Sequence, residues 1–295
     1  MSIHNHTNFS DGKDSIEDTV KRAKEIGLKT IGISDHFSVV GREKHLNPDN
    51  IGKHVDEVNR VRKKFPDMEI LVGPEVDFPI EDDVSKNEAQ LKVLRDIKSH
   101  YKIDYYIGSV HAISTKNFYI KGLHSTPPLP AVIRFDNFIS VLKHRLFSDY
   151  GWYVLNEYWR NMKMIAAEPM FDVIGHPDYI KLLNNETKKG IAANDLKRDF
   201  FKLVQQNNKV IEFNTGGYWW FPISFPGLGI LGTAIENNIP IIVTSDSHSK
   251  RNLTNCFDYA NKKLMKLVHK CPSKYQPRSP SNEVLKDLIF NVQYG

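Results

Sequence analysis

KTIGISDH, residues 29–36, decides the fold, because a short apolar, β-branched run ends there directly in an aspartate and a histidine. Such a run is typical of a buried strand, which we place at Lys29–Ser34. Five similar runs follow it, at Glu69–Val76, Asp104–Val110, Phe171–Gly175, Lys209–Asn214 and Pro240–Ser245. With the first few residues counted as a strand, the sequence predicts seven.

Helical segments separate these strands. Asp14–Ile26 opens with Ser15 and Asp18 as a loose capping box, and Asn47–Phe65 and Ala193–Asn207 are also amphipathic. Strands that alternate with amphipathic helices indicate βαβ units and a parallel sheet. Barrels of this length are commonly single units, so we expect one barrel domain over residues 1–295.

The composition is that of an ordinary globular protein. The 295 residues are 40% hydrophobic and 25% charged, which excludes disorder, collagen and coiled coil. There is no long apolar run and no basic, apolar leader at the start, so we expect a cytoplasmic protein without membrane partners. Two cysteines are too few for a disulfide framework. The net charge of +5 is spread out and does not indicate nucleic-acid binding.

Two stretches interrupt the alternation. The insertion at about 112–150 contains STPPLP and is too long for a normal βα connection, so it is either a functional lid or a packed surface excursion. The tail at about 272–295 starts Pro- and Ser-rich, and we expect it to wrap the surface before a short helix near Asn282–Phe290.

Residue types that bind metals follow every predicted strand. In order they are His4 and His6, Asp35 and His36, Glu75 and Asp77, His111, His176 and Asp178, Glu212 and Asn214, and Asp246 and His248. A barrel of parallel strands collects these ends on its C-terminal face, where the active sites of such folds lie. Six of the twelve histidines therefore converge.

Each signal alone has a structural alternative. His4 and His6, two apart on a strand, project from one face and could grip a metal ion or be a hydrogen-bonded pair. Asp246 and His248 repeat that spacing at the other end of the chain. Glu75 ends an apolar strand, where burying its charge is costly unless a cation or another partner compensates it. Together these signals favour a metal centre.

The donor set indicates the chemistry. Imidazoles and carboxylates without cysteine suit Zn, Mn or Fe in a hydrolytic site. About nine ligands exceed the need of one ion, so we expect two or three divalent ions with a bridging carboxylate. Clustered ions activate water and stabilise the oxygens of a phosphoryl displacement, which predicts phosphoester hydrolysis.

The ordered motifs carry a family resemblance. They are HNHTNFSDG from His4, ISDHF from Ile33, GPEVDF from Gly73, GSVH from Gly108, DVIGHPDY from Asp172, IEFNTGG from Ile211 and TSDSHS from Thr244. In this order the chain resembles the PHP (polymerase and histidinol phosphatase) superfamily, most of all its histidinol-phosphatases. The resemblance runs from residue 4 to about 250 and implies a distorted (β/α)7 TIM-like barrel with a trinuclear metal centre at the C-terminal ends of the strands.

The resemblance also implies a ligand set. It assigns the first ion to His4, His6, Glu75 and Asp246, the second to Glu75, His111 and His176, and the third to Asp11, His36 and His248. Some relatives have a histidine near the place of Asp11. In this chain Asp11 could cap the helix that follows instead of binding a metal ion.

The implied reaction is attack of a metal-activated hydroxide on a bound phosphate monoester. Candidates for protonating the leaving oxygen are Asp178 and the ligand-shell residues His36 and His248. Arg160, or else Arg42, could bind the phosphate as a fork, although each could be a surface cation. Glu212, Asn214 or Asp77 could accept hydrogen bonds from a substrate with an ammonium and an imidazole group.

Three functions stay open at this point. The leading one is hydrolysis of L-histidinol phosphate to L-histidinol and inorganic phosphate in histidine biosynthesis. The second keeps the metal-dependent phosphoesterase but changes the substrate to a nucleotide, a sugar phosphate or a nucleic-acid end. The third is a metal-binding protein without catalysis, which the intact ligand set disfavours.

Overall fold

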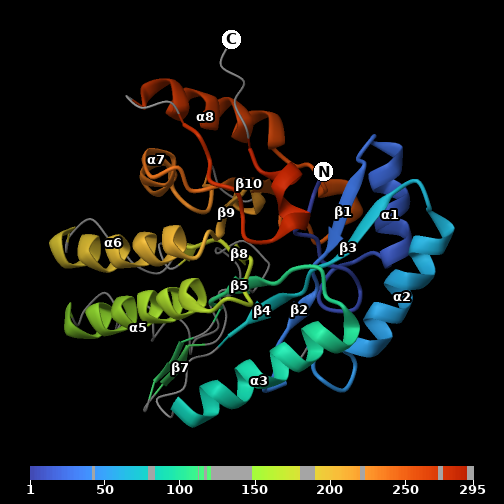
Figure 1. Ribbon diagram of the computed structural model, residues 1–295, viewed down its shortest axis with the longest axis horizontal. Helices are drawn as coiled ribbons and strands as arrows, with labels where there is room; N and C mark the ends of the chain where they lie inside the picture. The colour runs from blue at the N-terminus through green and yellow to red at the C-terminus, as the bar shows by residue number, and fades with distance from the viewer. Residues whose placement is uncertain are drawn as a thin grey trace.

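The structure, a computed structural model, describes most of the chain (Figure 1). The described residues are 1–41, 44–78, 84–111, 113–115, 118–120, 148–179, 190–219, 223–271 and 275–290. Parallel strands form the centre of the molecule, and helices lie around them (Figure 1).

Two of the predicted strands are interrupted where their polar motifs begin. The first is divided into β1 (Thr30–Ile33) and β2 (His36–Phe37), and the second into β3 (Glu69–Val72) and β4 (Glu75–Asp77). β1 pairs with β3 and β2 with β4, both in parallel. The remaining parallel strands are β5 (Ile107–Ser109), β8 (Val173–Ile174), β9 (Val210–Asn214) and β10 (Ile241–Thr244), and the sheet order is β10-β9-β8-β5-β4-β2.

Residues 2–6 join the two edges of this arrangement. On one side the Ser2 N–H donates to the Thr30 carbonyl at 3.2 Å, and an isolated parallel bridge links Ser2 to β1. On the other side the His6 N–H donates to the Ser247 carbonyl at 2.7 Å, just beyond β10. Within the described residues the fold is therefore the distorted seven-stranded α/β barrel that the sequence predicts.

The predicted helices are present with slightly different ends. α1 (Ile16–Glu25) begins at the capping residue Ser15, whose hydroxyl accepts the Asp18 N–H at 3.1 Å. α2 (Ile51–Lys64) and α6 (Gly190–Gln206) occupy the other two predicted segments. The remaining α-helices of the described chain are α3 (Val84–Tyr101), α5 (Ser148–Ala167), α7 (Leu228–Glu236) and α8 (Phe257–Lys270). Of the helices described, none is long and apolar enough to cross a membrane.

A separate apolar cluster fills the N-terminal end of the barrel. It consists of Ile3, Leu71, Tyr105, Ile107, Val173, Val210, Ile242, Leu285 and Leu288. Tyr105 lies across the interior, and a Cβ atom at Gly32 or Gly73 would come within 1.9 Å of its side chain. Glycine is therefore required at those two strand positions.

The tail closes this end of the barrel. The 3₁₀ helix η5 (Glu283–Leu288) places Leu285 and Leu288 in the apolar cluster, and both side chains are buried. Tyr275 is also buried, and its hydroxyl donates to the Ile239 carbonyl at 2.9 Å. The described tail thus lies on the surface with a few buried anchors, and η5 lies within the short helix predicted near Asn282–Phe290.

The insertion is described only in part. It contains an antiparallel hairpin of β6 (Ile113–Thr115) and β7 (Phe118–Ile120), and α5 begins at Ser148. STPPLP lies outside the described residues. The choice between a lid and a surface excursion therefore stays a prediction.

Candidate metal centre

The nine residues predicted to bind metal meet at the C-terminal ends of the strands. Each has a nitrogen or carboxylate oxygen within 3.4 Å of such an atom of another member. They are His4, His6, Asp11, His36, Glu75, His111, His176, Asp246 and His248. Their convergence follows from the parallel barrel, because every strand delivers its last inward-facing side chain to the same end.

Glu75, the first residue of β4, lies in the middle of the group. Its Oε2 atom is 2.7 Å from Nδ1 of His36 and 3.4 Å from Nε2 of His4. Its Oε1 atom is 2.9 Å from Nε2 of His176 and accepts the hydroxyl of Ser109 at 2.6 Å. The two oxygens thus face different sets of histidines, as expected of a bridging ligand.

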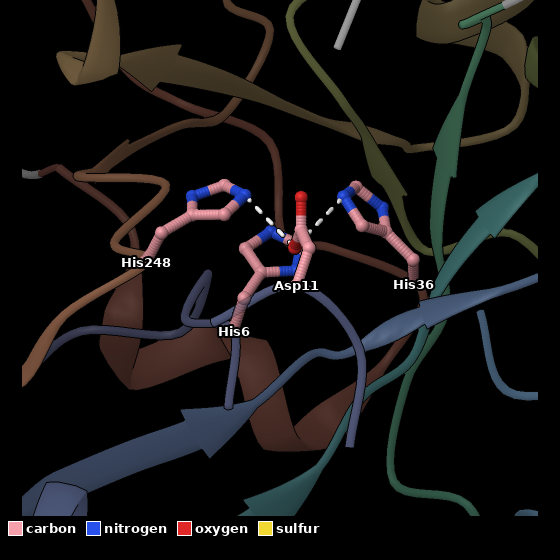
Figure 2. Close-up of side chains that lie close together, drawn as sticks. All are labelled: His6, Asp11, His36 and His248. Carbon is pink, nitrogen blue, oxygen red and sulfur yellow. Dashed lines mark ion pairs between the residues drawn. The ribbon is translucent and has the colours of Figure 1, made fainter. Parts of the chain in front are cut away.

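One side of the centre is more open. There His6, Asp11, His36 and His248 each place a ligand atom within 4.8 Å of the others. Figure 2 shows the rings of His36 and His248 on either side of the Asp11 carboxylate, with Nε2-to-oxygen distances of 3.6 and 3.1 Å. The side chains of Asp11 and His248 are 23% and 27% exposed, whereas His6 and His36 are buried. We call these four residues the open edge.

Two more groups share ligands with the open edge. His4, His6 and Glu75 form one, and His36, Glu75 and His111 form the other. His6 and His36 therefore each lie between two groups. The resemblance assigns each of these histidines to one ion, so the structure groups the ligands somewhat differently.

The buried polar atoms of the ligands are arranged as expected for a site that binds cations. Nε2 of His4 and Oε2 of Glu75 are fully buried and lie 3.4 Å apart, and Nε2 of His4 has no hydrogen-bond partner among the described residues. Buried polar atoms are normally paired, because desolvation without a partner is costly. A divalent ion between such atoms would compensate for that cost, and nitrogen and oxygen donors suit Zn, Mn or Fe.

The carboxylates are in the form that binds metal. Burial by itself would raise the pKa of Glu75, but His111, His4 and His36 around it lower that pKa well below its usual value. The pKa of Asp246 is lowered in the same way, chiefly by His4 and His6 against the effect of burial. Both groups are therefore ionised at neutral pH.

The histidines of the open edge differ in protonation. Burial, together with His36 and His248, lowers the pKa of His6 to about 4, so its imidazole is neutral. Burial would also lower the pKa of His248, but the hydrogen bond to Asp11 outweighs it and raises that pKa to about 9. A metal ion at this edge would therefore displace a proton from His248.

Glu212 and Asn214 lie beneath the ligands rather than at the open side. Oε2 of Glu212 is 2.8 Å from Nδ1 of His4, and the Asn214 amide donates to Oδ2 of Asp246 at 3.0 Å. Both side chains are buried. Their polar atoms therefore orient metal ligands, and the prediction that they contact a substrate stays a prediction.

Two further predicted residues are also buried. Asp77 accepts the backbone N–H of His111 at 3.3 Å, and Asp178 accepts the backbone N–H of Gly227 at 2.8 Å. Asp178 follows the ligand His176 by two residues. Its role as a proton donor stays a prediction.

Arg160 is not brought to the centre by the described structure. Arg160 lies on α5 with 43% of its side chain exposed and forms an ion pair with Glu157 at 2.9 Å. It lines a surface hollow together with Asp199 and Lys202 of α6. The reason is helical periodicity, because the neighbouring Trp159 faces the core and turns Arg160 outward. Arg42 lies outside the described residues.

Several residues near the centre are not among the predicted metal ligands or substrate-binding residues. His45 stacks on His36 with 4.9 Å between ring centroids, and no motif in the sequence marks it. Ser109, which holds Glu75, precedes His111 by two residues, so the alternation of the strand could have identified it. Asp35 and His54 form a buried contact at 3.1 Å behind the open edge.

Comparisons with known proteins agree with this geometry. The family model of the PHP domain matches residues 2–216. A Schizosaccharomyces pombe protein named "Probable histidinol-phosphatase" is 24% identical over 278 residues, which cover 84% of this chain and 80% of that protein.

Two solved structures have a similar fold. One, from Listeria monocytogenes and named as a candidate histidinol phosphatase, is 17% identical with a TM-score of 0.66 and covers 88% of this chain and 98% of its own. The other is a histidinol phosphate phosphatase from Lactococcus lactis in complex with Zn, L-histidinol and phosphate. It is 18% identical with a TM-score of 0.63, and the likeness covers 90% of this chain and 92% of that one.

Proposed function

This chain belongs to the PHP domain family, and on that premise we propose that it is a metal-dependent phosphomonoesterase that hydrolyses L-histidinol phosphate to L-histidinol and inorganic phosphate. The observation that carries the proposal is the convergence of six histidines and three carboxylates around Glu75 at the C-terminal end of the barrel. The substrate is supported by the S. pombe relative and by the ligands of the L. lactis structure.

The nine converging residues would hold two or three divalent ions, with Glu75 shared between ions. Ions bound there would activate water for attack on phosphorus and neutralise charge on the phosphate oxygens. The protein's own part is to keep the ligands in place. Glu212 selects the tautomer of His4, because its carboxylate next to Nδ1 favours a proton there and leaves Nε2 free as a ligand.

The open edge is the side from which a phosphate monoester would enter, because Asp11 and His248 are its partly exposed members. A departing alkoxide needs a proton. His36 and His248 would use nitrogens to bind metal, so Asp178 is the first candidate for the proton donor. Its buried carboxyl lies beside the ligand strand β8 and is oriented by the Gly227 N–H.

The direct test is phosphate release by the purified protein. We expect L-histidinol phosphate to be hydrolysed with added Mn or Zn, and not in a chelated control. A panel of nucleotide and sugar phosphates should react far more slowly. Turnover of another panel member instead would refute the substrate but leave a PHP phosphoesterase. Silence across the panel with metals bound would also refute the substrate and would mean that the site serves a compound outside the panel.

The biological role can be tested separately. If the chain serves histidine biosynthesis, deletion of its gene should make growth depend on added histidine. Growth without histidine, in a strain that contains no other enzyme with this activity, would contradict the assignment.

A further inference from the structure

We propose that Asp35 is a positioning residue that sets the affinity of the open edge for its metal ion, by holding the loop that carries Asp11. This loop, residues 7–14, is called the Asp11 loop here. The proposal depends on the metal centre of the proposed function but not on its substrate.

The Asp35 carboxylate is buried and bonded to the Asp11 loop three times. Oδ1 accepts the Thr7 N–H at 2.7 Å and the Ser10 hydroxyl at 2.6 Å. Oδ2 accepts the Thr7 hydroxyl at 2.6 Å. Hydrogen bonds to an ionised acceptor are stronger than neutral ones, so these contacts hold the loop tightly.

A second element braces the carboxylate from behind. Nε2 of His54, on α2, lies 3.1 Å from Oδ2 of Asp35, and both side chains are buried. The ring of His54 also meets the ring of Phe9 edge-on, with 5.3 Å between centroids. The Asp11 loop is therefore fixed to a helix of the outer layer as well as to the strand.

The partners of Asp35 are the chain neighbours of the ligands. Thr7 follows His6, Ser10 precedes Asp11, and Asp35 itself precedes His36. One carboxylate thus connects three of the four members of the open edge, although it binds none of the ions itself. The described hydrogen bonds of its carboxylate do not reach Glu75, His111 or His176. Only the backbone carbonyl of Asp35 contacts that group, by accepting the Glu75 N–H at 3.2 Å, and a side-chain substitution retains this bond.

This asymmetry predicts a selective effect. Loosening the Asp11 loop should weaken the ion bound by His6, Asp11, His36 and His248 and leave the ions around Glu75 nearly unchanged. Changes to the groups that orient metal ligands typically cost roughly 10–100-fold in metal affinity.

The test measures metal content, with no substrate present. Wild type and Asp35→Asn are loaded with Zn, dialysed against graded chelator, and analysed for bound ions per chain by mass spectrometry of the metal. We expect Asp35→Asn to lose one ion at roughly 10–100-fold lower chelator activity than wild type, and the remaining ions at the wild-type position.

Asp172→Asn is the matched control. Asp172 is also a buried carboxylate beside a strand, where it accepts the Tyr106 N–H at 2.9 Å and binds Lys98 at 2.7 Å, but it lies at the opposite end of the barrel. We expect this variant to melt at a lower temperature and to keep the wild-type chelation curve.

Two results would overturn the proposal. One is a wild-type chelation curve for Asp35→Asn, and the other is equal weakening of every ion in step with a lowered melting temperature. If Asp35→Asn does not fold, Ser10→Ala can replace it, because it removes a single donor from a partly exposed position. This variant should lower the affinity for the same ion by a smaller factor. A failure to hydrolyse L-histidinol phosphate would not affect either result.

Discussion

The two ends of the barrel are built from the same strands but differ in chemistry. β9 turns Val210 inward at its beginning and Glu212 two residues later, and β10 does the same with Ile242 and Thr244. The first member of each pair joins the apolar cluster, and the second supports the metal ligands. Alternation thus decides which side chains face inward, and the position along the strand decides whether they serve stability or function.

The ends also differ in how their burial is compensated. The N-terminal end buries apolar side chains, which is favourable by itself. The C-terminal end buries imidazoles and carboxylates, which is costly unless they are paired or bind cations. We therefore expect changes at one end to alter activity and metal content, and changes at the other to alter the free energy of unfolding.

Replacing Glu75 should have the largest effect. Glu75→Gln removes the charge from the residue that faces histidines with both oxygens, so we expect kcat/KM to fall by about 10²- to 10³-fold or more. Fewer ions should be bound per chain, measured by mass spectrometry of the metal. Full metal content with unchanged turnover would show that the centre does not depend on a bridging carboxylate.

The opposite end is tested by Leu285→Ala. The substitution leaves a cavity in the apolar cluster and should lower the free energy of unfolding by about 2–5 kcal/mol, measured with urea on the metal-loaded protein. Activity per folded molecule should be unchanged. A loss of activity under conditions in which the variant is fully folded would show that the two ends do not have separate roles.

Glu212→Gln tests where the functional end of the barrel begins. Each oxygen of Glu212 accepts hydrogen bonds from two sides, with His4 and Thr244 at Oε2 and with His176 and Asn214 at Oε1. An amide NH₂ in either place would face a donor. We expect metal affinity to fall by about 10–100-fold, measured by competition with a chelating dye, with a modest change in unfolding. Wild-type affinity would mean that His4 needs no such partner.

Arg160→Ala should have the smallest effect. Arg160 lies on the outer surface of α5 and its ion pair with Glu157 is exposed, so we expect kcat/KM and stability to change by no more than about twofold. A tenfold rise in KM for L-histidinol phosphate would contradict this and return Arg160 to the role of phosphate ligand.

The ends of the strands were the part of the site that could be predicted from sequence. Glu75 and His111 follow recognisable apolar runs, and parallel topology then requires them to meet. Whether an inward side chain binds a metal ion or lies behind a ligand was harder to predict. Alternation turns Glu212 inward but does not show that His4 covers it. The orientation of Arg160 depends on the register of α5 against the sheet, which no local motif marks.

Contacts between distant segments could not be predicted. Asp35 belongs to a recognised motif, but its partners on the Asp11 loop and on α2 are determined by packing. The buried anchors of the tail could not be predicted for a similar reason. Its Pro- and Ser-rich start is typical of a surface segment, whereas the two leucines that close the barrel are too sparse to form a pattern.

The position of residues 2–6 has a consequence for synthesis of the protein on the ribosome. His4 and His6 leave the ribosome before the rest of the barrel, but their strand gains its second neighbour only when Ser247 has been made. Asp246 and His248 arrive at the same moment. A nascent chain that stops before them has a first strand with one neighbour and an incomplete ligand set, so the barrel closes and the metal centre is completed in one late event.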